Sequence, residues 1–515
     1  MQSYQRVPAG FSGKLIRLPL FLLLFGLFSA AMLVPAVYGG VVRELETARA
    51  FLYSAILGLS IFTMIGLAHA GRDPRHGSLG PLMSLFSAFV FLPAILAVPF
   101  YEGLGTTSFI NAYVEMVSAI TTTGAAVFED PDRLNGSLHL WRGLVAWLGG
   151  LLMWIAASAI LAPLNLGGFE VTARAEPGRT TSRDYSMNAP EARVRIIKVA
   201  SVLAPIYCAL TLLLWVLLAV AGDAGLVAVI HAMSVMATSG ISPVGGLTGA
   251  GSGVTGEIVM LLFMLFALSR LTFSTDTVTS DTGGLRQDPE FRIGLALVIV
   301  VPMMLFARHF IGAVDVNAED DLIGALRAFW GSAFTVMSFL TTTGFASANW
   351  ADAQSWSGLA TPGLLLMGLA LIGGGVATTA GGVKLLRVFA LYLNGLREME
   401  KLVHPSSVGS SRVMGRRVQK GSAFIAWVFF MLFALTLAAI TVALAATGVP
   451  FETSIAIAVA GLSTTGPLLD VAVSTPISVI DLGGTAKGIF VAAMVLGRLE
   501  MLAIIALLTP DLWRG

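Results

Sequence analysis

Long apolar runs constrain this chain more than any other feature of its sequence. Hydrophobic residues make up 56% of the 515 residues and charged residues only 12%, so lipid must surround much of the surface. A membrane-crossing helix needs about 20 mostly apolar residues. We therefore predict an all-α integral membrane protein with about ten transmembrane helices. The runs cover residues 15–39, 50–70, 80–100, 141–163, 196–221, 255–273, 291–312, 360–395, 422–447 and 487–509.

The rest of the composition excludes several other classes of protein. A net charge of +1 is far from the basicity of a nucleic-acid-binding chain, so no nucleic acid partner is expected. The single cysteine, Cys208, allows neither a disulfide nor a cysteine-based metal site within one chain. Residues 1–20 are basic and lead into an apolar run without a small-residue cleavage site. This pattern predicts a first membrane helix rather than a removable signal peptide.

Charged residues divide the loops into two sets. Basic residues lie before the first run and after the second, fourth, sixth and eighth: Arg6, Lys14, Arg17, Arg72, Arg75, Arg174, Arg179, Arg183, Arg193, Arg195, Lys198, Arg286, Arg292, Arg412, Arg416, Arg417 and Lys420. Acidic residues occupy the opposite loops: Glu102, Glu129, Asp130, Asp132, Asp315, Glu319, Asp320 and Asp321. Because loops rich in Lys and Arg stay in the cytoplasm, we expect both termini there.

A shorter segment recurs four times between the apolar runs, at residues 108–127, 226–245, 323–347 and 452–470. Each copy has the pattern of about three helical turns, too short to cross a membrane, and ends in hydroxyl residues and a glycine. Because the glycines lie about 100–120 residues apart, each copy belongs to one repeat of span, short helix, loop and span. The candidate binding residues are Thr122, Thr123, Gly124, Thr238, Ser239, Gly240, Thr342, Thr343, Gly344, Thr464, Thr465 and Gly466.

Each copy taken alone is open to two interpretations. A glycine just past a helix end is an ordinary helix C-cap. Four copies at matching places favour loops that meet on one axis, because non-helical backbone inside a membrane must be buried in protein or line water. A helix C-terminus carries the negative end of the helix dipole, and an extended loop beyond it can replace an ion's water shell with carbonyl oxygens. The pattern therefore predicts a path for a cation.

The loops TTTGA at 121–125 and TTTGF at 341–345 resemble those of the Trk/Ktr/HKT superfamily of potassium transporters. GGGVATTAGGVK at 373–384 and GRLE at 497–500 extend the resemblance over nearly the whole chain, and two leading spans are similar to the TrkH branch. The resemblance implies that K⁺ binds at the four loops and that this chain holds no other cofactor. The second and fourth loops, ATSGIS and STTGPL, depart from many relatives by being richer in hydroxyl groups. They leave the preference between potassium and sodium open.

The domain plan follows from the repeat and the resemblance. We predict two N-terminal transmembrane helices in residues 1–78 and four helix–pore loop–helix repeats around one central pore. The repeats cover residues 79–190, 191–288, 289–420 and 421–515.

The eighth apolar run, 360–395, is too long for one straight span and is broken by consecutive glycines. Each glycine costs a helix about 1 kcal/mol relative to alanine. A flexible kink or a close helix crossing would explain them, whereas the resemblance implies a gate loop beneath the filter. The predicted gate residues are Gly373, Gly374, Gly375, Thr378, Thr379, Gly381, Gly382, Lys384 and Arg498.

Arg498 lies inside the last apolar run, two residues before Glu500. An unpaired arginine in lipid is costly, so it should face protein or water, unless its side chain extends to the membrane surface. Residues two apart do not share a helix face, so these two side chains are expected to point differently. We expect Arg498 to form a positive barrier below the filter, and Arg270, near Asp276 and Asp281, to lie at a span end.

The basic stretches 171–198 and 396–421 are longer than simple turns. Positive-inside charge explains part of their composition. The resemblance further implies a homodimer in the bacterial inner membrane, with a TrkA-like cytoplasmic ring of nucleotide-binding regulatory subunits docked on this face. This chain has no phosphate-cradling GxGxxG motif, so any nucleotide would sit on that partner.

Three other functions compete with potassium uptake. A sodium-permeable or coupled cation transporter would use the same fold. A transporter with inverted repeats would need two matching broken helices, whereas the sequence shows one. A membrane-embedded hydrolase could use His231, but about two helical turns separate it from Thr238 and Ser239, beyond hydrogen-bond reach. We expect His231 to face the outer vestibule and the chain not to be an enzyme.

Gly124→Ser tests the filter assignment. Sodium-preferring plant relatives carry serine at this position, and a side chain there would reshape the carbonyl ring that strips water from the ion. We expect a lower preference for potassium over sodium in uptake assays. An unchanged ratio of the two uptakes would contradict the assignment.

Overall fold

The computed structural model describes residues 18–69, 80–162, 189–269, 288–312, 322–359, 361–404, 412–413, 416–417, 422–473, 475–500 and 504. Nearly all regular structure in these residues is helical, which confirms the predicted fold class. The one exception is an antiparallel pair of two-residue strands, β1 (Arg412–Val413) and β2 (Arg416–Arg417). It lies in the basic stretch that separates the third and fourth predicted repeats.

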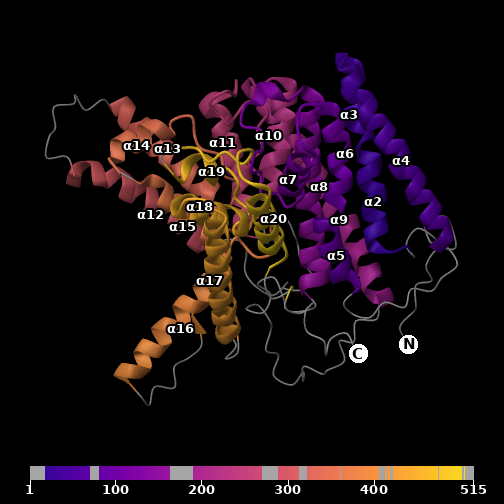
Figure 1. Ribbon diagram of the computed structural model, residues 1–515. Coiled ribbons are helices and arrows are strands. Elements are labelled where there is room, and N and C mark those ends of the chain that lie inside the picture. Colours follow the sequence, from indigo (N-terminus) through magenta and orange to yellow (C-terminus); the bar gives the residue numbers. More distant parts are fainter. Residues whose placement is uncertain are drawn as a thin grey trace.

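Two spans precede the repeats. The first is a rod of two helices, α2 (Leu20–Ala31) and α3 (Leu33–Val42), and the second is α4 (Leu45–His69). Both α2 and α3 pack on α4. In Figure 1 these indigo helices form one flank of the molecule, so they cover the repeats rather than contribute to the centre.

The repeats follow in chain order. The first contains α5 (Gly80–Val90), α6 (Leu92–Leu104), α7 (Phe109–Ile120), η1 (Pro131–Arg133), α8 (Gly136–Ala156) and η2 (Ala157–Leu161). The second contains α9 (Ala189–Ala221), α10 (Gly225–Ala237), α11 (Gly253–Met264) and η5 (Leu265–Leu268). The third contains α12 (Pro289–Gly312), α13 (Leu322–Leu340), α14 (Trp350–Ser357), α15 (Pro362–Ile372) and α16 (Leu385–Val403). The fourth contains α17 (Ser422–Ala446), α18 (Phe451–Leu462), α19 (Leu468–Val471) and α20 (Gly484–Leu499).

In every repeat one helix, here called the pore helix, packs against an earlier and a later helix of the same repeat. The pore helix α7 packs on α6 and α8, and α10 packs on α9 and α11. In the same way α13 packs on α12 and α15, and α18 packs on α17 and α20. The pore helices α7 and α10 also contact flanking helices of another repeat, α20 and α8 respectively. The repeats therefore share one core.

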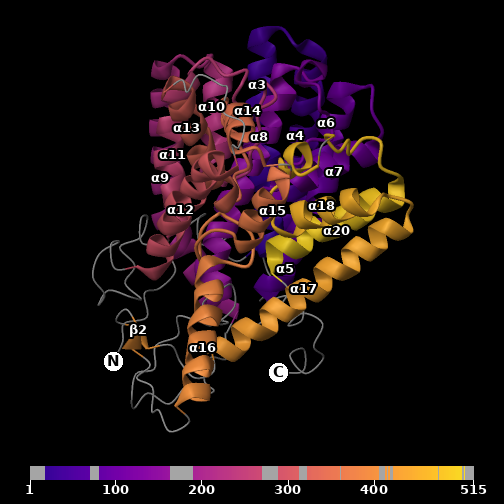
Figure 2. The same ribbon diagram turned by 90° about the vertical axis from the view of Figure 1, so that its left-hand side faces the viewer.

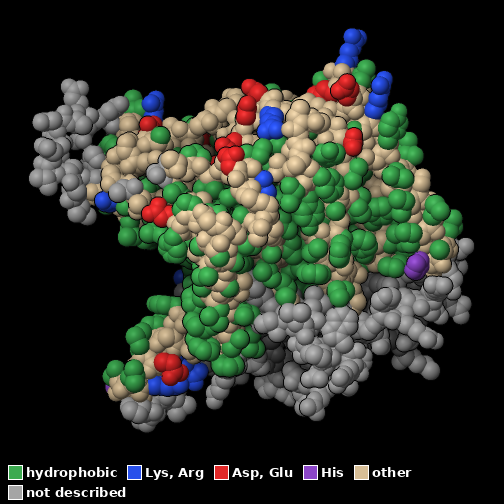
Figure 3. All heavy atoms as spheres, viewed as in Figure 1, with side chains coloured by type: hydrophobic (Ala, Val, Ile, Leu, Met, Phe, Trp, Pro, Cys, Tyr) green, Lys and Arg blue, Asp and Glu red, His purple; other side chains and the backbone are tan. Residues whose placement is uncertain are grey.

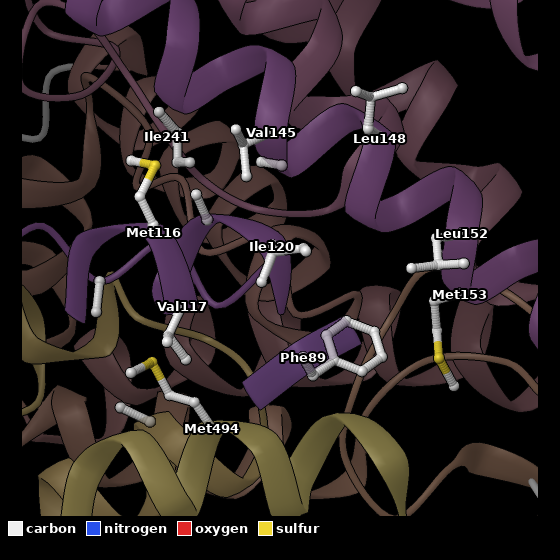
Figure 4. Packing of buried hydrophobic residues seen from close by; sticks show 14 of the residues in the cluster. Phe89, Met116, Val117, Ile120, Val145, Leu148, Leu152, Met153, Ile241 and Met494 are labelled. Atoms are coloured by element: carbon white, nitrogen blue, oxygen red, sulfur yellow. The ribbon is translucent and has the colours of Figure 1, made fainter. Parts of the chain in front are cut away.

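The first pore helix shows how this core is built. Figure 4 shows Met116, Val117 and Ile120 of α7 among side chains of α8 and α20, including Val145 and Met494. All five side chains are buried. Because close-packed interiors transmit small volume changes, the end of this helix is held firmly where the non-helical loop begins.

Eight of the described helices are long and apolar enough to cross a membrane, or nine if the bent pair α14 and α15 counts as one span. Two of the expected spans are shorter, since α11 with η5 covers Gly253–Leu268 and α20 covers Gly484–Leu499. The third pore helix is longer than expected, since Ile323–Leu340 also meets the length criterion for a span. Figure 3 shows hydrophobic side chains covering the flank and charged ones gathered mainly at its upper edge.

The eighth apolar run does not form one helix. The helix α15 ends at Ile372, and α16 begins at Leu385 after a buried non-helical segment. Figures 1 and 2 both show α16 and the adjoining end of α17 projecting from the main body. Many of the loop residues on which the predicted orientation rests lie outside the described residues, as do Arg270, Asp276 and Asp281.

Gly149→Ala tests the packing of the first pore helix. A Cβ atom at Gly149 of α8 would collide with the backbone carbonyl of Ile120, the last residue of α7. We expect the variant to lose about 1–3 kcal/mol of stability, measured by thermal unfolding of the purified protein in detergent. Gly368→Ala in α15 is the matched control, because its Cβ would meet open space. Equal unfolding temperatures for the two variants would contradict this account.

Candidate functional site

The four pore helices end in the same unusual backbone conformation. Just past each helix end, the chain turns into the left-handed region, with φ between 52° and 57°. In every repeat this residue is a threonine: Thr122, Thr238, Thr342 and Thr464. A β-branched residue in this region is a true outlier, and such strain persists only where the surrounding structure enforces it. The strained threonine is thus a common feature of all four loops.

The hydrogen bonds of the turn explain how this conformation is held. In each repeat the next residue donates its backbone N–H to a helix carbonyl five residues back, with an N–O distance of 2.9 Å. The pairs are Thr123 to Ser118, Ser239 to Ser234, Thr343 to Ser338 and Thr465 to Ala460. This is the helix C-cap of the first interpretation, but threonine rather than glycine occupies its left-handed position. Both interpretations are therefore partly right, because the cap shapes the start of the loop.

The glycines of the four loops close a ring. A Cβ atom on Gly124 would collide with the carbonyl oxygen of Ser239 in the second loop, and one on Gly240 with that of Thr343 in the third. Gly344 lies against Pro467 of the fourth loop, and a Cβ on Gly466 would collide with the backbone of Ala125 in the first. Each glycine thus abuts the next repeat in order. The structure brings all four predicted loops together.

The ring contains buried backbone oxygen atoms without hydrogen bonds. Within the described part of the chain, no hydrogen bond uses the carbonyl oxygens of Thr122, Ser239 or Thr343, and these residues are fully buried. Unpaired buried carbonyls need a compensating partner. Since carbonyl oxygens are hard ligands that suit a desolvated cation, the geometry of the ring fits a cation-binding site.

The hydroxyl groups of the loops serve two purposes. Those of Thr123 and Thr343 bond to the neighbouring Thr121 and Thr341 at 2.8 and 3.0 Å, so they brace their own loops. By contrast, among the described residues the buried hydroxyl of Thr122 has no partner. The other strained threonines vary. Thr464 also lacks a hydrogen bond there, Thr238 bonds to Ala237, and Thr342 accepts from the gate segment.

The fourth loop differs from the other three. Gly466 does not have a positive φ, unlike the other three glycines of the ring. Its backbone N–H donates to the carbonyl oxygen of Thr123 at 2.6 Å, and the ring of Pro467 reaches both Gly240 and Gly344. The chain then enters the short helix α19. The ring is therefore fourfold at its threonines and asymmetric at its glycines.

Eight of the nine predicted gate residues lie in the segment between α15 and α16, and every residue from Gly373 to Lys384 is buried. The segment is tied to three of the pore loops. The N–H of Gly381 donates to Thr342 Oγ1 at 2.7 Å, and the hydroxyl of Thr379 donates to the Met236 carbonyl at 3.2 Å. A Cβ on Gly381 would also collide with the Ser463 carbonyl. The segment therefore lies directly against the helix-side end of the ring.

Arg498 belongs to the same assembly. It is only 3% exposed, so its side chain does not extend to the surface, and its Nη1 donates to the Thr379 carbonyl at 2.7 Å. Its Nε and Nη2 have no hydrogen-bond partner among the described residues. Together with Lys384 and Glu500 it lines a cavity of about 20 Å³ beside the gate segment. A buried cation thus lies next to the path that an ion would take beyond the ring.

The sequence-based account missed the partner of Glu500. Its Oε2 accepts a hydrogen bond from Arg387 Nη2 at 2.7 Å, and the guanidinium of Arg387 lies 3.6 Å from the centre of the Phe429 ring. This pair joins α16 to the end of α20 and confirms that Arg498 and Glu500 point differently. The signal was present in the sequence, since a buried arginine in an apolar helix requires a counter-charge.

The expected position of His231 is wrong. It is fully buried, its Nε2 lies 3.0 Å from Ser242 Oγ, and its Nδ1 lies 3.5 Å from Asp223 Oδ2. This resembles a serine–histidine–aspartate arrangement. However, the Ser242 hydroxyl also bonds the Gly246 carbonyl at 3.1 Å, so it is held within its own loop. The contact braces the loop.

An acidic group lies four residues beyond Gly466. The pKa of Asp470 is raised to about 6, chiefly because neighbouring protein desolvates its carboxylate and further because of the charge of Glu129. The residue as a whole remains exposed, so the carboxylate can still attract cations. Its negative charge is present above this pH and is lost as the pH falls through 6.

Membrane-spanning helices and four strained loops closed into one oxygen-lined ring define a membrane transport protein for cations. Comparisons with known proteins agree. A family model described as TrkH, cation transport protein, matches residues 287–512. The Trk system potassium uptake protein TrkH of Halomonas elongata is 32% identical over 438 residues, which cover 84% of each chain. The chain belongs to the TrkH family.

Two further relatives cover almost the full length. The Trk system potassium uptake protein TrkH of Salmonella typhimurium is 29% identical over 500 residues, which cover 96% of this chain and 98% of that protein. The crystal structure of the potassium transporter TrkH from Vibrio parahaemolyticus superimposes with a TM-score of 0.80 at 26% identity. It covers 97% of this chain and 99% of its own. The predicted resemblance to the TrkH branch is thereby confirmed.

Glu500→Ala tests the buried ion pair. The change leaves the charge of the fully buried Arg387 without its counter-charge, which costs about 3–5 kcal/mol. We expect a large drop in unfolding temperature in detergent. The matched control is Glu398→Ala, which breaks the exposed pair with Lys401 and should cost about 1 kcal/mol or less. A loss for Glu500→Ala no larger than that of the control would contradict the pairing.

Proposed function

We propose that this protein takes up potassium ions across the bacterial cytoplasmic membrane through the ring of four loops. The observation that carries the proposal is the left-handed turn shared by the four loops, at Thr122, Thr238, Thr342 and Thr464. At each turn the backbone passes from a pore helix into the ring. The family and the relatives named for potassium uptake support the same cargo.

The mechanism follows from the helix ends. Each pore helix points its C-terminus, which carries about half a negative charge, toward the ring. A cation entering the ring exchanges water for carbonyl oxygens such as those of Ser239 and Thr343. The backbone N–H groups of the same residues are turned back to their own helices, so the ring presents acceptors and repels anions. The predicted filter residues all belong to these four loops.

The segment Gly373–Lys384 and Arg498 are proposed as the gate. The segment contacts three loops from the helix side, and Arg498 holds the Thr379 carbonyl while leaving two donor groups unpaired. A cation leaving the ring would meet this positive charge. Flow therefore requires the segment to move, and with it the Gly381 N–H that occupies the Thr342 hydroxyl.

A sodium-permeable transporter is the second candidate. The bond between Gly466 N–H and the Thr123 carbonyl removes one oxygen from the ring, which lowers its fourfold symmetry. Selectivity that depends on the number of coordinating oxygens would then weaken. Whether flow is passive or coupled to another ion belongs to the same question.

The remaining proposals concern the setting of the pore. They are a homodimer, both termini in the cytoplasm, repeats bounded as in the predicted domain plan, and a TrkA-like cytoplasmic ring of regulatory subunits. The naming of the relatives as parts of a Trk system supports a multi-component assembly. The projecting helix α16 would offer a docking face (Figure 2).

Uptake by purified protein in liposomes tests the function. Rubidium uptake driven by an outward potassium gradient should be saturable and should resist competition by sodium. Protein-free liposomes and the Gly124→Ser variant are the controls. Uptake equal to that of protein-free liposomes, from protein that is folded and inserted, would overturn the proposal. Full competition by equal sodium would favour the second candidate.

Arg498→Ala tests the gate. Two unit charges about 6 Å apart repel by roughly 3 kcal/mol at an effective dielectric constant of about 20, which is about a hundredfold in rate. Removing the arginine also frees the Thr379 carbonyl. We expect potassium leak to rise by up to that factor in liposomes, while Lys401→Ala on exposed α16 leaves it unchanged. Slower flux through correctly folded Arg498→Ala would reject the barrier.

A further inference from the structure

Three pore helices carry a hydrogen-bonding side chain at the same register, nine residues before the glycine of the ring. These residues are Glu115, His231 and Thr335. The fourth helix has the apolar Ile457 there. Because the repeats share one geometry, this register faces the part of the loop that leaves the ring beyond the glycine, here called the outer limb.

In the first repeat the contact is direct. Glu115 accepts the backbone N–H of Val127, three residues beyond Gly124, at 2.8 Å through Oε2. Its Oε1 pairs with Arg142 Nε of α8 at 2.5 Å, and both side chains are almost completely buried. The arginine supplies the counter-charge that a buried carboxylate requires. The outer limb is therefore fastened to the pore helix by a charge-assisted bond.

In the third repeat a neutral side chain makes the equivalent bond. Thr335 Oγ1 accepts the backbone N–H of Ser347, also three residues beyond its glycine, at 3.1 Å. Glu257 of α11 adds two bonds to the same limb, from the Ser347 hydroxyl at 2.8 Å and the Ala348 N–H at 2.7 Å. The outer limbs of the first and third repeats are thus both held by side chains of neighbouring helices.

The other two repeats show why the register differs there. In the second, the residue three beyond the glycine is Pro243, which has no N–H, and His231 bonds the hydroxyl of Ser242 instead. In the fourth, the N–H of Leu469 donates to the Gly466 carbonyl at 2.9 Å. That limb turns into α19 and needs no tether from Ile457.

We propose that Glu115, His231 and Thr335 are positioning residues that hold the outer limbs against the pore helices and thereby set the discrimination between potassium and sodium. The inference rests on the proposed function and assigns selectivity to residues that touch no ion. A loop fastened from behind cannot contract around the smaller sodium ion, so the oxygens stay at the spacing that suits potassium. Arg142 acts through Glu115.

Thr335→Val is the sharpest variant, because it keeps the shape of the side chain and removes only the acceptor for the Ser347 N–H. We expect the ratio of rubidium to sodium uptake in liposomes to fall by about tenfold, equivalent to about 1.4 kcal/mol. Thr335→Ser, which restores an acceptor, should return the parent ratio. Ile457→Val, at the same register without a tether, should leave the ratio unchanged.

A second variant guards against a change confined to one repeat. Glu115→Met combined with Arg142→Met removes both buried charges together, which buried pairs often tolerate, and leaves the Val127 N–H without its acceptor. It should lower the same ratio. The inference would be overturned if folded Thr335→Val and the folded double variant both keep the parent ratio of rubidium to sodium uptake. An equal loss of this ratio in Ile457→Val would also overturn it. Absent uptake by the parent protein would instead overturn the proposed function.

Discussion

Backbone that leaves a helix inside a membrane must find its hydrogen-bond partners within the protein. The rest of this structure depends on how four loops meet that constraint. The first backbone N–H groups of each loop donate to carbonyl oxygens of its own pore helix. This pattern forces Thr122 and its three equivalents into a left-handed turn. The carbonyl oxygens that remain face the neighbouring loops. A strained local turn and an oxygen-lined ring are thus two results of the same hydrogen bonds.

The flanking helices supply the rigidity that this strain needs. Pore helix α7 is packed between α8 and α20, and Gly149 lets α8 approach the carbonyl at its end. Buried polar groups do the same for the loops, since Glu115 and Glu257 hold backbone N–H groups beyond the ring. Without such support a β-branched residue would relax out of the left-handed region. Packing, charge pairing and loop conformation therefore act as one unit.

The gate segment is likewise held by close packing and hydrogen bonds, at the helix-side end of the ring. Its glycines allow close approach to η5 and to the loops, and its hydrogen bonds end on Thr342, Met236 and Arg498. Because the Gly381 N–H bonds a hydroxyl of the ring, any movement of this segment would change the oxygens that the ring presents. The nearby ion pair of Arg387 and Glu500 joins α16 to the end of α20, which holds the C-terminal side of the segment between α15 and α16 in place.

Sequence alone determined the class of fold, the four loops and the broken eighth run, because each depends on the composition of a short stretch of the chain. Apolar length specifies a lipid-facing helix, and a hydroxyl-rich stretch ending in glycine marks the point where a helix stops. The TrkH resemblance rested on the same local motifs. It placed every filter and gate residue within the segments that the structure brings together, although their roles stay predictions.

Only the tertiary structure decided which side chains meet across repeats. The pairing of Glu500 with Arg387 spans 113 residues, and Arg498 reaches Thr379 across 119. The burial of His231 and the bond from Gly466 to Thr123 were equally invisible. The spacing of residues along a chain constrains contacts within a helix or turn, whereas contacts between repeats depend on how whole helices pack. That packing is a property of the assembled core and not of any single segment.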